Sequence, residues 1–135
     1  MHPRRYRGPV PLIRVVLADD DARFRQLVRD VLEDDGYEVV AEAADAVEAV
    51  QLAAEHRPDV VVVDLVLPGA TGLSAVRELL AARPRRAVLV LSSLFDPAVE
   101  EEAEALGATY LDKTDGVEAL EEAIDAAVAS VRGER

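Results

Sequence analysis

Polar side chains that could do chemistry follow four short apolar runs of this sequence. Asp19 and Asp20 follow the first run, Asp64 follows four consecutive valines, and Ser92 and Lys113 follow two later runs. Carboxylates held within a few ångströms repel one another, so such a group is most stable around a hard divalent cation, for which Mg²⁺ is the natural candidate. With a cation and an ammonium group nearby, a carboxylate can attack a phosphoryl group. Asp64 is the predicted nucleophile because a rigid apolar strand precedes it, whereas Asp19 and Asp20 open a loop and can turn toward a metal.

Each of these residues also has an ordinary structural explanation when it is taken alone. An aspartate after a strand is often only the N-cap of a helix, Ser92 could be a turn residue, and Lys113 could be a solvated surface charge. Reactive or metal-binding residue types at the ends of four different strands are harder to explain by capping and solvation alone. Lys113 is also the only lysine among 15 basic residues, the others being arginine. A guanidinium cannot replace a compact ammonium at close quarters, which favours a specific role for Lys113, although a single lysine could fall there by chance.

The elements that would position these residues alternate between short β-branched runs and longer segments of helical period. This alternation predicts an α/β fold with a five-stranded parallel sheet and helices on both faces. The predicted strands are Ile13 to Ala18, Glu38 to Ala43, Val60 to Val63, Ala87 to Leu91 and Thr109 to Leu111. The predicted helices are Ala22 to Asp34, Ala46 to His56, Leu73 to Ala82, Pro97 to Leu106 and Val117 to Val131. Since ligands of open parallel sheets bind at the carboxyl ends of the strands, the polar residues should meet at one edge of the sheet.

Capping residues support the predicted boundaries of the later helices. Asp96 before Pro97 predicts the N-cap of the fourth helix, and Asp115 with Glu118 predicts a capping box at the start of the fifth. Gly107 lies where the C-cap of the fourth helix is expected.

Length and charge restrict the possible functions. The chain has 135 residues, 15 basic and 27 acidic side chains and a net charge of −12, which describes one globular domain and argues against a nucleic-acid-binding surface. The absence of cysteine excludes thiolate zinc sites, iron–sulfur clusters and thiol nucleophiles, and it agrees with a cytoplasmic location. We expect residues 1–11 to be a disordered, basic, proline-rich tail before one domain at 12–135, with no secretion signal and no membrane span.

Three stretches carry a resemblance to a known family. They are VVLADDDARFR from Val15, VVVVDLVLPGATG from Val60, and the pair VLVLSS and YLDK toward the C-terminus. In this order and spacing they resemble the response-regulator receiver domain, the phospho-acceptor half of two-component signalling, from about Leu12 to Val131. The resemblance implies a flavodoxin-like, doubly wound (βα)5 fold.

The same resemblance implies roles for the acidic residues. Asp19 and Asp20 look like the metal-binding pair, which with Asp64 would hold Mg²⁺, and Asp64 looks like the phosphorylated aspartate. Asp21 is excluded from the metal set, because Phe24 and the arginine after it stand where the family pattern places them relative to Asp20.

Three further residues match the family near the C-terminus. Ser92 matches the hydroxyl that bonds the phosphoryl group, Lys113 the phosphate-contacting lysine and Tyr110 the aromatic switch. Upon phosphorylation, Ser92 would move toward the phosphoryl oxygens and Tyr110 would turn inward behind it. Three features depart from the pattern: the stretch from Gly107 to Lys113 is one residue shorter than usual, Asp112 lies beside the lysine, and Leu67 replaces a frequent methionine.

The implied function is that of a stand-alone receiver without turnover of a separate substrate. It would accept phosphate on Asp64 from the phosphohistidine of a sensor histidine kinase or phosphotransfer protein, and signal through altered contacts with a downstream protein. A homodimer through the helix Pro97 to Leu106, the strand Thr109 to Leu111 and the helix Val117 to Val131 is also expected from the resemblance.

Two alternatives remain open from the sequence. One is a degenerate receiver that binds partners without phosphorylation. The other is an aspartyl phosphatase of the haloacid-dehalogenase type, which would need a second acid where Val66 stands. In receivers, Val66 and Leu94 border the path of water to the aspartyl phosphate, and because both are aliphatic we expect slow dephosphorylation.

Overall fold

The computed structural model of the chain describes residues 12–65 and 72–131. The predicted tail at residues 1–11 and Val66 lie outside these ranges. None of the helices in the described ranges is both long and apolar enough to cross a membrane.

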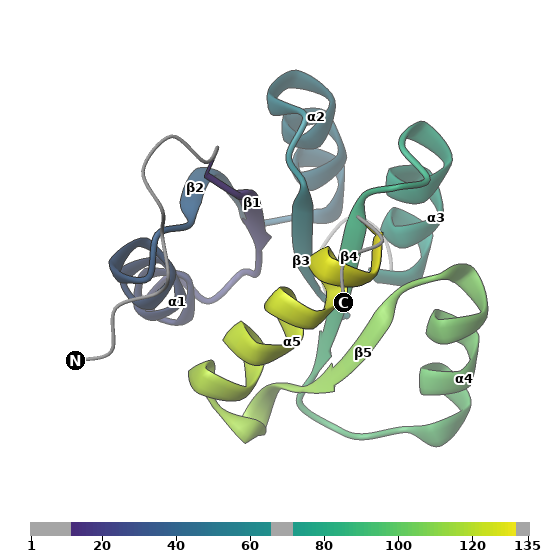
Figure 1. Ribbon diagram of the computed structural model, residues 1–135. Helices are drawn as coiled ribbons and strands as arrows, with labels where there is room; N and C mark the ends of the chain where they lie inside the picture. Colours follow the sequence, from purple (N-terminus) through teal and green to yellow (C-terminus); the bar gives the residue numbers. More distant parts are fainter. Residues whose placement is uncertain (1–11, 66–71, 132–135) are drawn as a thin grey trace.

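Five parallel strands form one sheet within the described residues, as predicted (Figure 1). Their spatial order is β2-β1-β3-β4-β5, so the valine-rich third strand lies at the centre. The strands are β1 Arg14–Ala18, β2 Glu38–Ala43, β3 Val60–Asp64, β4 Ala87–Ser92 and β5 Thr109–Asp112. The last three each extend one residue beyond the prediction, and Asp64 and Ser92 therefore belong to the hydrogen-bonded sheet.

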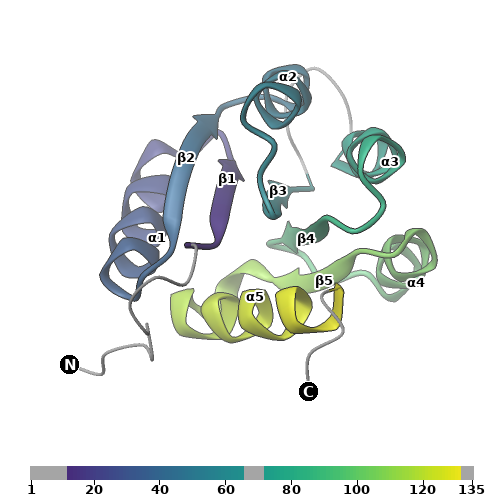
Figure 2. The same cartoon turned by 45° about the horizontal axis from the view of Figure 1, so that its top comes forward.

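The helices cover both faces of this sheet (Figure 2). α1 and α5 pack on one face, and α2, α3 and α4 pack on the other. The helices are α1 Ala22–Asp34, α2 Ala46–His56, α3 Gly72–Ala82, α4 Pro97–Leu106 and α5 Val117–Val131. This arrangement is the doubly wound, flavodoxin-like fold that the sequence predicts.

Alternation of side chains along the strands divides the core into two layers. Val15 and Leu17 of β1 pack with the α1 and α5 side, whereas Val16 and Ala18 pack with the α2, α3 and α4 side. All four valines of β3 are at most 3% exposed. Burial of a valine side chain contributes about 1.5 to 3 kcal/mol, so the strand that ends in Asp64 is firmly anchored.

The predicted caps of α4 are confirmed, and the one predicted for α5 is wrong. Asp96 Oδ1 accepts a hydrogen bond from the backbone N–H of Ala98 at 3.0 Å, and Gly107 ends α4 with a φ of 101°. At α5, Gly116 takes the N-cap position, because its carbonyl accepts from the N–H of Leu120 at 3.2 Å. Asp115 instead ends a short 3-10 turn, Lys113–Asp115, that the periodicity of the sequence did not indicate.

Candidate functional site

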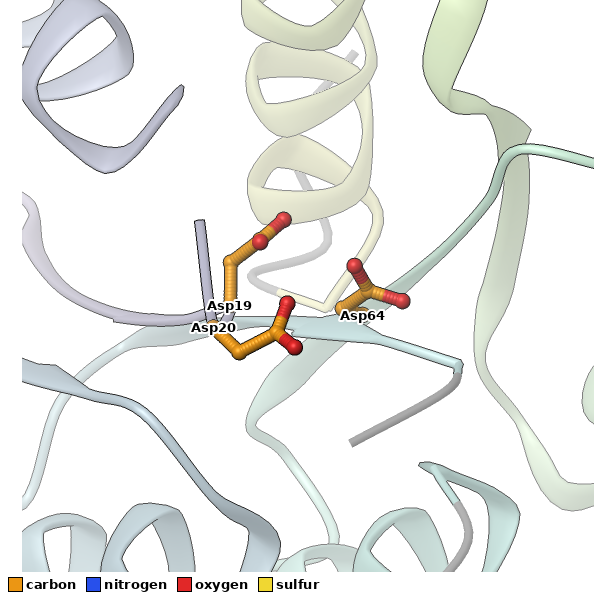
Figure 3. Close-up of side chains that lie close together, drawn as sticks. All are labelled: Asp19, Asp20 and Asp64. Atoms are coloured by element: carbon orange, nitrogen blue, oxygen red, sulfur yellow. The ribbon is translucent and has the colours of Figure 1, made fainter. Parts of the chain in front are cut away.

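Three carboxylates meet at the carboxyl edge of the sheet (Figure 3). Asp19, Asp20 and Asp64 each offer one oxygen, and these atoms all lie within 4.8 Å of one another. Asp64 ends β3 and Asp19 directly follows β1, and these two strands pair in the sheet. Asp19 and Asp64 are buried, at 3% and 8% exposure, whereas Asp20 is exposed. The group therefore offers a hard, all-oxygen ligand set that opens to solvent on the Asp20 side, which fits a Mg²⁺ ion that keeps several waters.

Lys113 links two of these carboxylates. Its Nζ lies 2.6 Å from Asp19 Oδ2 and 3.0 Å from Asp64 Oδ2, and 4.5 Å from the centre of the Phe24 ring. Burial alone would lower the pKa of Lys113, but the hydrogen bonds to Asp19 and Asp64 raise it above its usual value. The ammonium is therefore charged at neutral pH and compensates part of the negative charge of the site.

Asp112 builds the turn that delivers Lys113. Its Oδ1 accepts hydrogen bonds from the N–H of Thr114 at 2.9 Å and from Thr114 Oγ1 at 2.6 Å. These two bonds hold the pKa of Asp112 below its usual value. The unusual carboxylate beside the lysine thus has a local role as the cap of the 3-10 turn.

The loop between β1 and α1 gives different roles to its three consecutive acids. Asp19 Oδ1 accepts from the N–H of Asp21 at 2.8 Å, and the N–H of Asp19 donates to Ala43 O at 3.0 Å. Asp21 is the N-cap of α1, with Oδ1 accepting from the N–H of Arg23 and of Phe24 at 3.0 and 3.2 Å. The structure therefore agrees with leaving Asp21 out of the metal set.

The surroundings of Asp19 disfavour its charged form. Burial raises its pKa above the usual value, and the nearby charge of Asp64 adds to this effect. Hydrogen bonds with Lys113 and with the N–H of Asp21 act in the opposite direction without cancelling it. A cation bound at this position would relieve the excess negative charge.

Ser92 ends β4 with its hydroxyl engaged in its own loop. Its Oγ donates to Leu94 O at 2.6 Å and accepts from the N–H of Leu94 at 3.2 Å. The serine is 3% exposed, while the side chain of Leu94 is 82% exposed. Ser92 must release the bond that it donates to Leu94 O before its hydroxyl can donate to a group on Asp64.

Tyr110 on β5 is buried and lies against the loop before α4. Its hydroxyl oxygen accepts from the N–H of Asp96 at 3.1 Å. Its ring meets Phe95 edge to face, with 5.7 Å between the ring centres and 69° between the planes. The aromatic residue singled out from the sequence therefore contacts the segment that joins Ser92 to α4.

Two residues of α1 contribute contacts that the sequence reasoning missed. Phe24 lies against the Lys113 ammonium, and Arg25 donates to the carbonyl of Asp19. In the sequence, both residues only indicated which of the three consecutive acids match the family pattern. Their place in the first turn of a helix that starts beside the site was the one available signal.

Comparisons with known proteins agree with this geometry. A family model described as the response regulator receiver domain matches residues 15–125. The chain is 37% identical over 120 residues to the transcriptional regulatory protein PdtaR of Mycobacterium tuberculosis, covering 88% of this chain and 58% of that protein. It is 35% identical over 95 residues to the chemotaxis protein CheY of Thermotoga maritima, covering 70% of this chain and 79% of that protein.

A solved structure is similar over almost the whole fold. The crystal structure of a two-component response regulator of the LuxR family from Aurantimonas sp. SI85-9A1 superposes with a TM-score of 0.82 at 37% identity. The match covers 93% of this chain and 89% of that one. By contrast, this chain spans little more than half the length of PdtaR, at 58%.

Proposed function

Because this chain belongs to the response regulator receiver domain family, we propose that Asp64 accepts a phosphoryl group from the phosphohistidine of a sensor histidine kinase or phosphotransfer protein. The chain is a signalling module rather than an enzyme that turns over a separate substrate. The observation that carries the proposal is the position of Asp64, which is anchored at the end of the central strand, paired with Lys113 at 3.0 Å and grouped with Asp19 and Asp20.

The proposed transfer forms one bond and breaks one. A carboxylate oxygen of Asp64 bonds to phosphorus while the phosphorus–nitrogen bond of the donor breaks, and the imidazole nitrogen keeps the electron pair and later takes a proton. Lys113 already lies beside Asp64 Oδ2, so its ammonium would stabilise charge on a phosphoryl oxygen. We propose that Asp19, Asp20 and Asp64 hold Mg²⁺, which supplies further positive charge at the phosphoryl group when it is bound.

The signal would follow from a shift between two conformations. We propose that Ser92 leaves the backbone of Leu94 and bonds the phosphoryl group, which changes the loop that leads to α4. Tyr110 is already 7% exposed here, so phosphorylation would stabilise its inward position rather than create it. Amide exchange on α4, β5 and α5 with and without beryllofluoride tests this step, and unchanged exchange on that face would count against it.

The charge of the same face bears on its partner. α4 carries four acidic side chains and α5 carries four, of which Glu121 is buried, while neither helix has a basic one. A second copy that met this face through its own α4, β5 and α5 would bring like charges together. We therefore propose a downstream protein with basic residues as the favoured partner, with the homodimer as the alternative, and no direct contact with nucleic acid. Sedimentation of the phosphorylated protein at low and high salt separates the two.

Two other functions are less well supported. A haloacid-dehalogenase type phosphatase needs an acid where the sequence has Val66. A degenerate receiver would not need the lysine and three carboxylates that this site brings together. The cytoplasm is the proposed compartment, because the lack of cysteine agrees with a reducing environment.

Mass spectrometry after incubation with Mg²⁺ and acetyl phosphate tests the proposed function directly. We expect one added phosphoryl group on the wild-type protein and none on Asp64→Asn. No addition to the wild type, or addition to both proteins, would reject Asp64 as the acceptor.

A further inference from the structure

The loop between β1 and α1 supplies two of the three grouped carboxylates, so its backbone must be held in place. One restraint is the hydrogen bond from the N–H of Asp19 to Ala43 O on β2. A second comes from α1, where Arg25 Nη1 donates to the carbonyl oxygen of Asp19. Arg25 therefore restrains the main chain of the loop, whereas Lys113 contacts the side-chain carboxylate of Asp19.

Arg25 is itself held by a residue of the sheet. Its Nε lies 2.9 Å from Glu42 Oε1, and Glu42 on β2 pairs in register with Leu17 on β1. The side chains of Arg25 and Glu42 are 18% and 23% exposed. A pair this shielded is more persistent than an exposed ion pair, and the rigid guanidinium can serve the carboxylate and the carbonyl together.

Arg29, one turn further along α1, provides a natural comparison. It donates to the other oxygen of Glu42 and lies 3.5 Å from Glu33 Oε2. Its contacts among the described residues are with these two glutamates. Arg25 and Arg29 thus share a carboxylate partner and a charge, and they differ in the bond to Asp19.

We propose that Arg25 is a positioning residue for the metal-binding loop, an inference that rests on the proposed function. By fixing the carbonyl of Asp19, it keeps Asp19 and the adjacent Asp20 near Asp64 before a cation arrives, so less conformational freedom is lost when Mg²⁺ binds. Arg25 uses the carbonyl and Glu42 as acceptors, and so it leaves the carboxylate oxygens of the site to the cation.

Positioning and simple charge make opposite predictions for this residue. If only charge mattered, removal of a positive group near the site would strengthen the binding of Mg²⁺, and Arg25→Lys would change nothing. If Arg25 positions the loop, Arg25→Met and Arg25→Lys should both weaken binding, because neither side chain can serve Glu42 and the carbonyl with a rigid fork.

The test is a titration of the wild type, Arg25→Met, Arg25→Lys and Arg29→Met with Mg²⁺ at constant ionic strength, followed by backbone amide chemical shifts. We expect about a tenfold loss of affinity in Arg25→Met, by analogy with other residues that orient metal ligands. Arg25→Lys should show a smaller loss, and Arg29→Met should stay within about twofold of the wild type.

Thermal unfolding of each variant separates a folding defect from a defect at the site. Should Arg25→Met fail to fold, Arg25→Lys carries the test. Wild-type or tighter affinity in the folded Arg25 variants would overturn the inference and leave the proposed function intact, as would an equal loss in Arg29→Met. A wild-type protein that does not bind Mg²⁺ would overturn the proposed metal site itself and the inference with it.

Discussion

The hydroxyl of Tyr110 accepts a hydrogen bond from the backbone N–H of Asp96, with 3.1 Å between oxygen and nitrogen. Asp96 is also the N-cap of α4, since its side chain accepts from the N–H of Ala98. The tyrosine on β5 is therefore linked by hydrogen bonds to the first turn of α4, so a displacement of one is coupled to a displacement of the other.

Replacing Tyr110 by phenylalanine tests this tie. The variant keeps a ring that can pack against Phe95 and loses the acceptor for Asp96. We expect a loss of about 1 kcal/mol in the free energy of unfolding by urea, because a partly buried N–H is left without its partner. Exchange of the Asp96 amide should become faster in the variant. Unchanged stability and exchange would show that the bond does not hold the loop.

The proposed metal site gives a second prediction. The double variant Asp20→Asn with Asp64→Asn should lose Mg²⁺ binding, since only Asp19 would remain as a charged ligand, and we expect Asp19 to act partly through water. Asp21→Asn is the matched control, because asparagine also serves as an N-cap and should leave Mg²⁺ affinity almost unchanged. Wild-type affinity in the double variant, measured by titration, would show that the site is misplaced.

The raised pKa of Asp19 predicts how stability changes with pH in the absence of metal. The folded protein holds the Asp19 proton more tightly than the unfolded chain. As the pH rises from 3.8, the usual pKa of aspartate, through the raised pKa of Asp19, this group therefore lowers the stability of the fold. Lys113 adds no slope there, because its raised pKa matters only above its usual value of 10.5. Asp19→Asn should therefore gain on the wild type in melting temperature as the pH rises above 3.8. A constant difference over this range would contradict the raised pKa.

Much of the site could be predicted because its positions follow from strand periodicity. Four consecutive valines are typical of a buried parallel strand, and the residue that ends such a strand lies at the ligand-binding edge, which identifies Asp64. Lys113 stood out because arginine replaces lysine everywhere else in the chain. The contacts of Arg25 could not be predicted, because they depend on how α1 packs against β2. The bonds of Ser92 to Leu94 likewise depend on the local course of a loop.

Arg86 shows the same limit for a charged residue in the core. Arg86 is 4% exposed, and its guanidinium donates to three carbonyl oxygens, those of Leu79 at 3.2 Å, Pro58 at 3.4 Å and Ala53 at 3.5 Å. Burial, with a contribution from the charge of Arg83, lowers its pKa. No sequence pattern predicts this, because arginine is mostly a surface residue.

Substitution of Arg86 by lysine should therefore be costly. A single ammonium cannot reach carbonyls on α2, α3 and the loop after α2 together, so we expect a loss of about 2 kcal/mol in unfolding free energy. Arg85→Lys is the control, since Arg85 is exposed and its bond to Val131 O can be replaced by water. Equal effects of the two substitutions on urea unfolding would show that burial of Arg86 is not what matters.

The last prediction concerns the lifetime of the phosphorylated state, and it depends on Val66 and Leu94. Val66 lies outside the described residues, whereas Leu94 is 82% exposed in the loop after Ser92. Neither aliphatic side chain can donate to or accept from a water that attacks the aspartyl phosphate, so we expect slow self-dephosphorylation. Because it is so exposed, Leu94 would act through its lack of a polar group rather than through packing over the site.

The double variant Val66→Asn with Leu94→Glu tests this directly. The exposed position of Leu94 allows a glutamate without loss of core packing, and the new polar groups could orient the attacking water. Loss of phosphate from the purified phosphorylated protein should become faster by about a hundredfold, the lower end of the range for a positioned general base. Val47→Glu places the same charge at another exposed aliphatic residue, on α2, and should leave the decay rate near that of the wild type. An unchanged or slower decay in the double variant would reject the assignment of Val66 and Leu94, because water would then reach the phosphoryl group without help from either position.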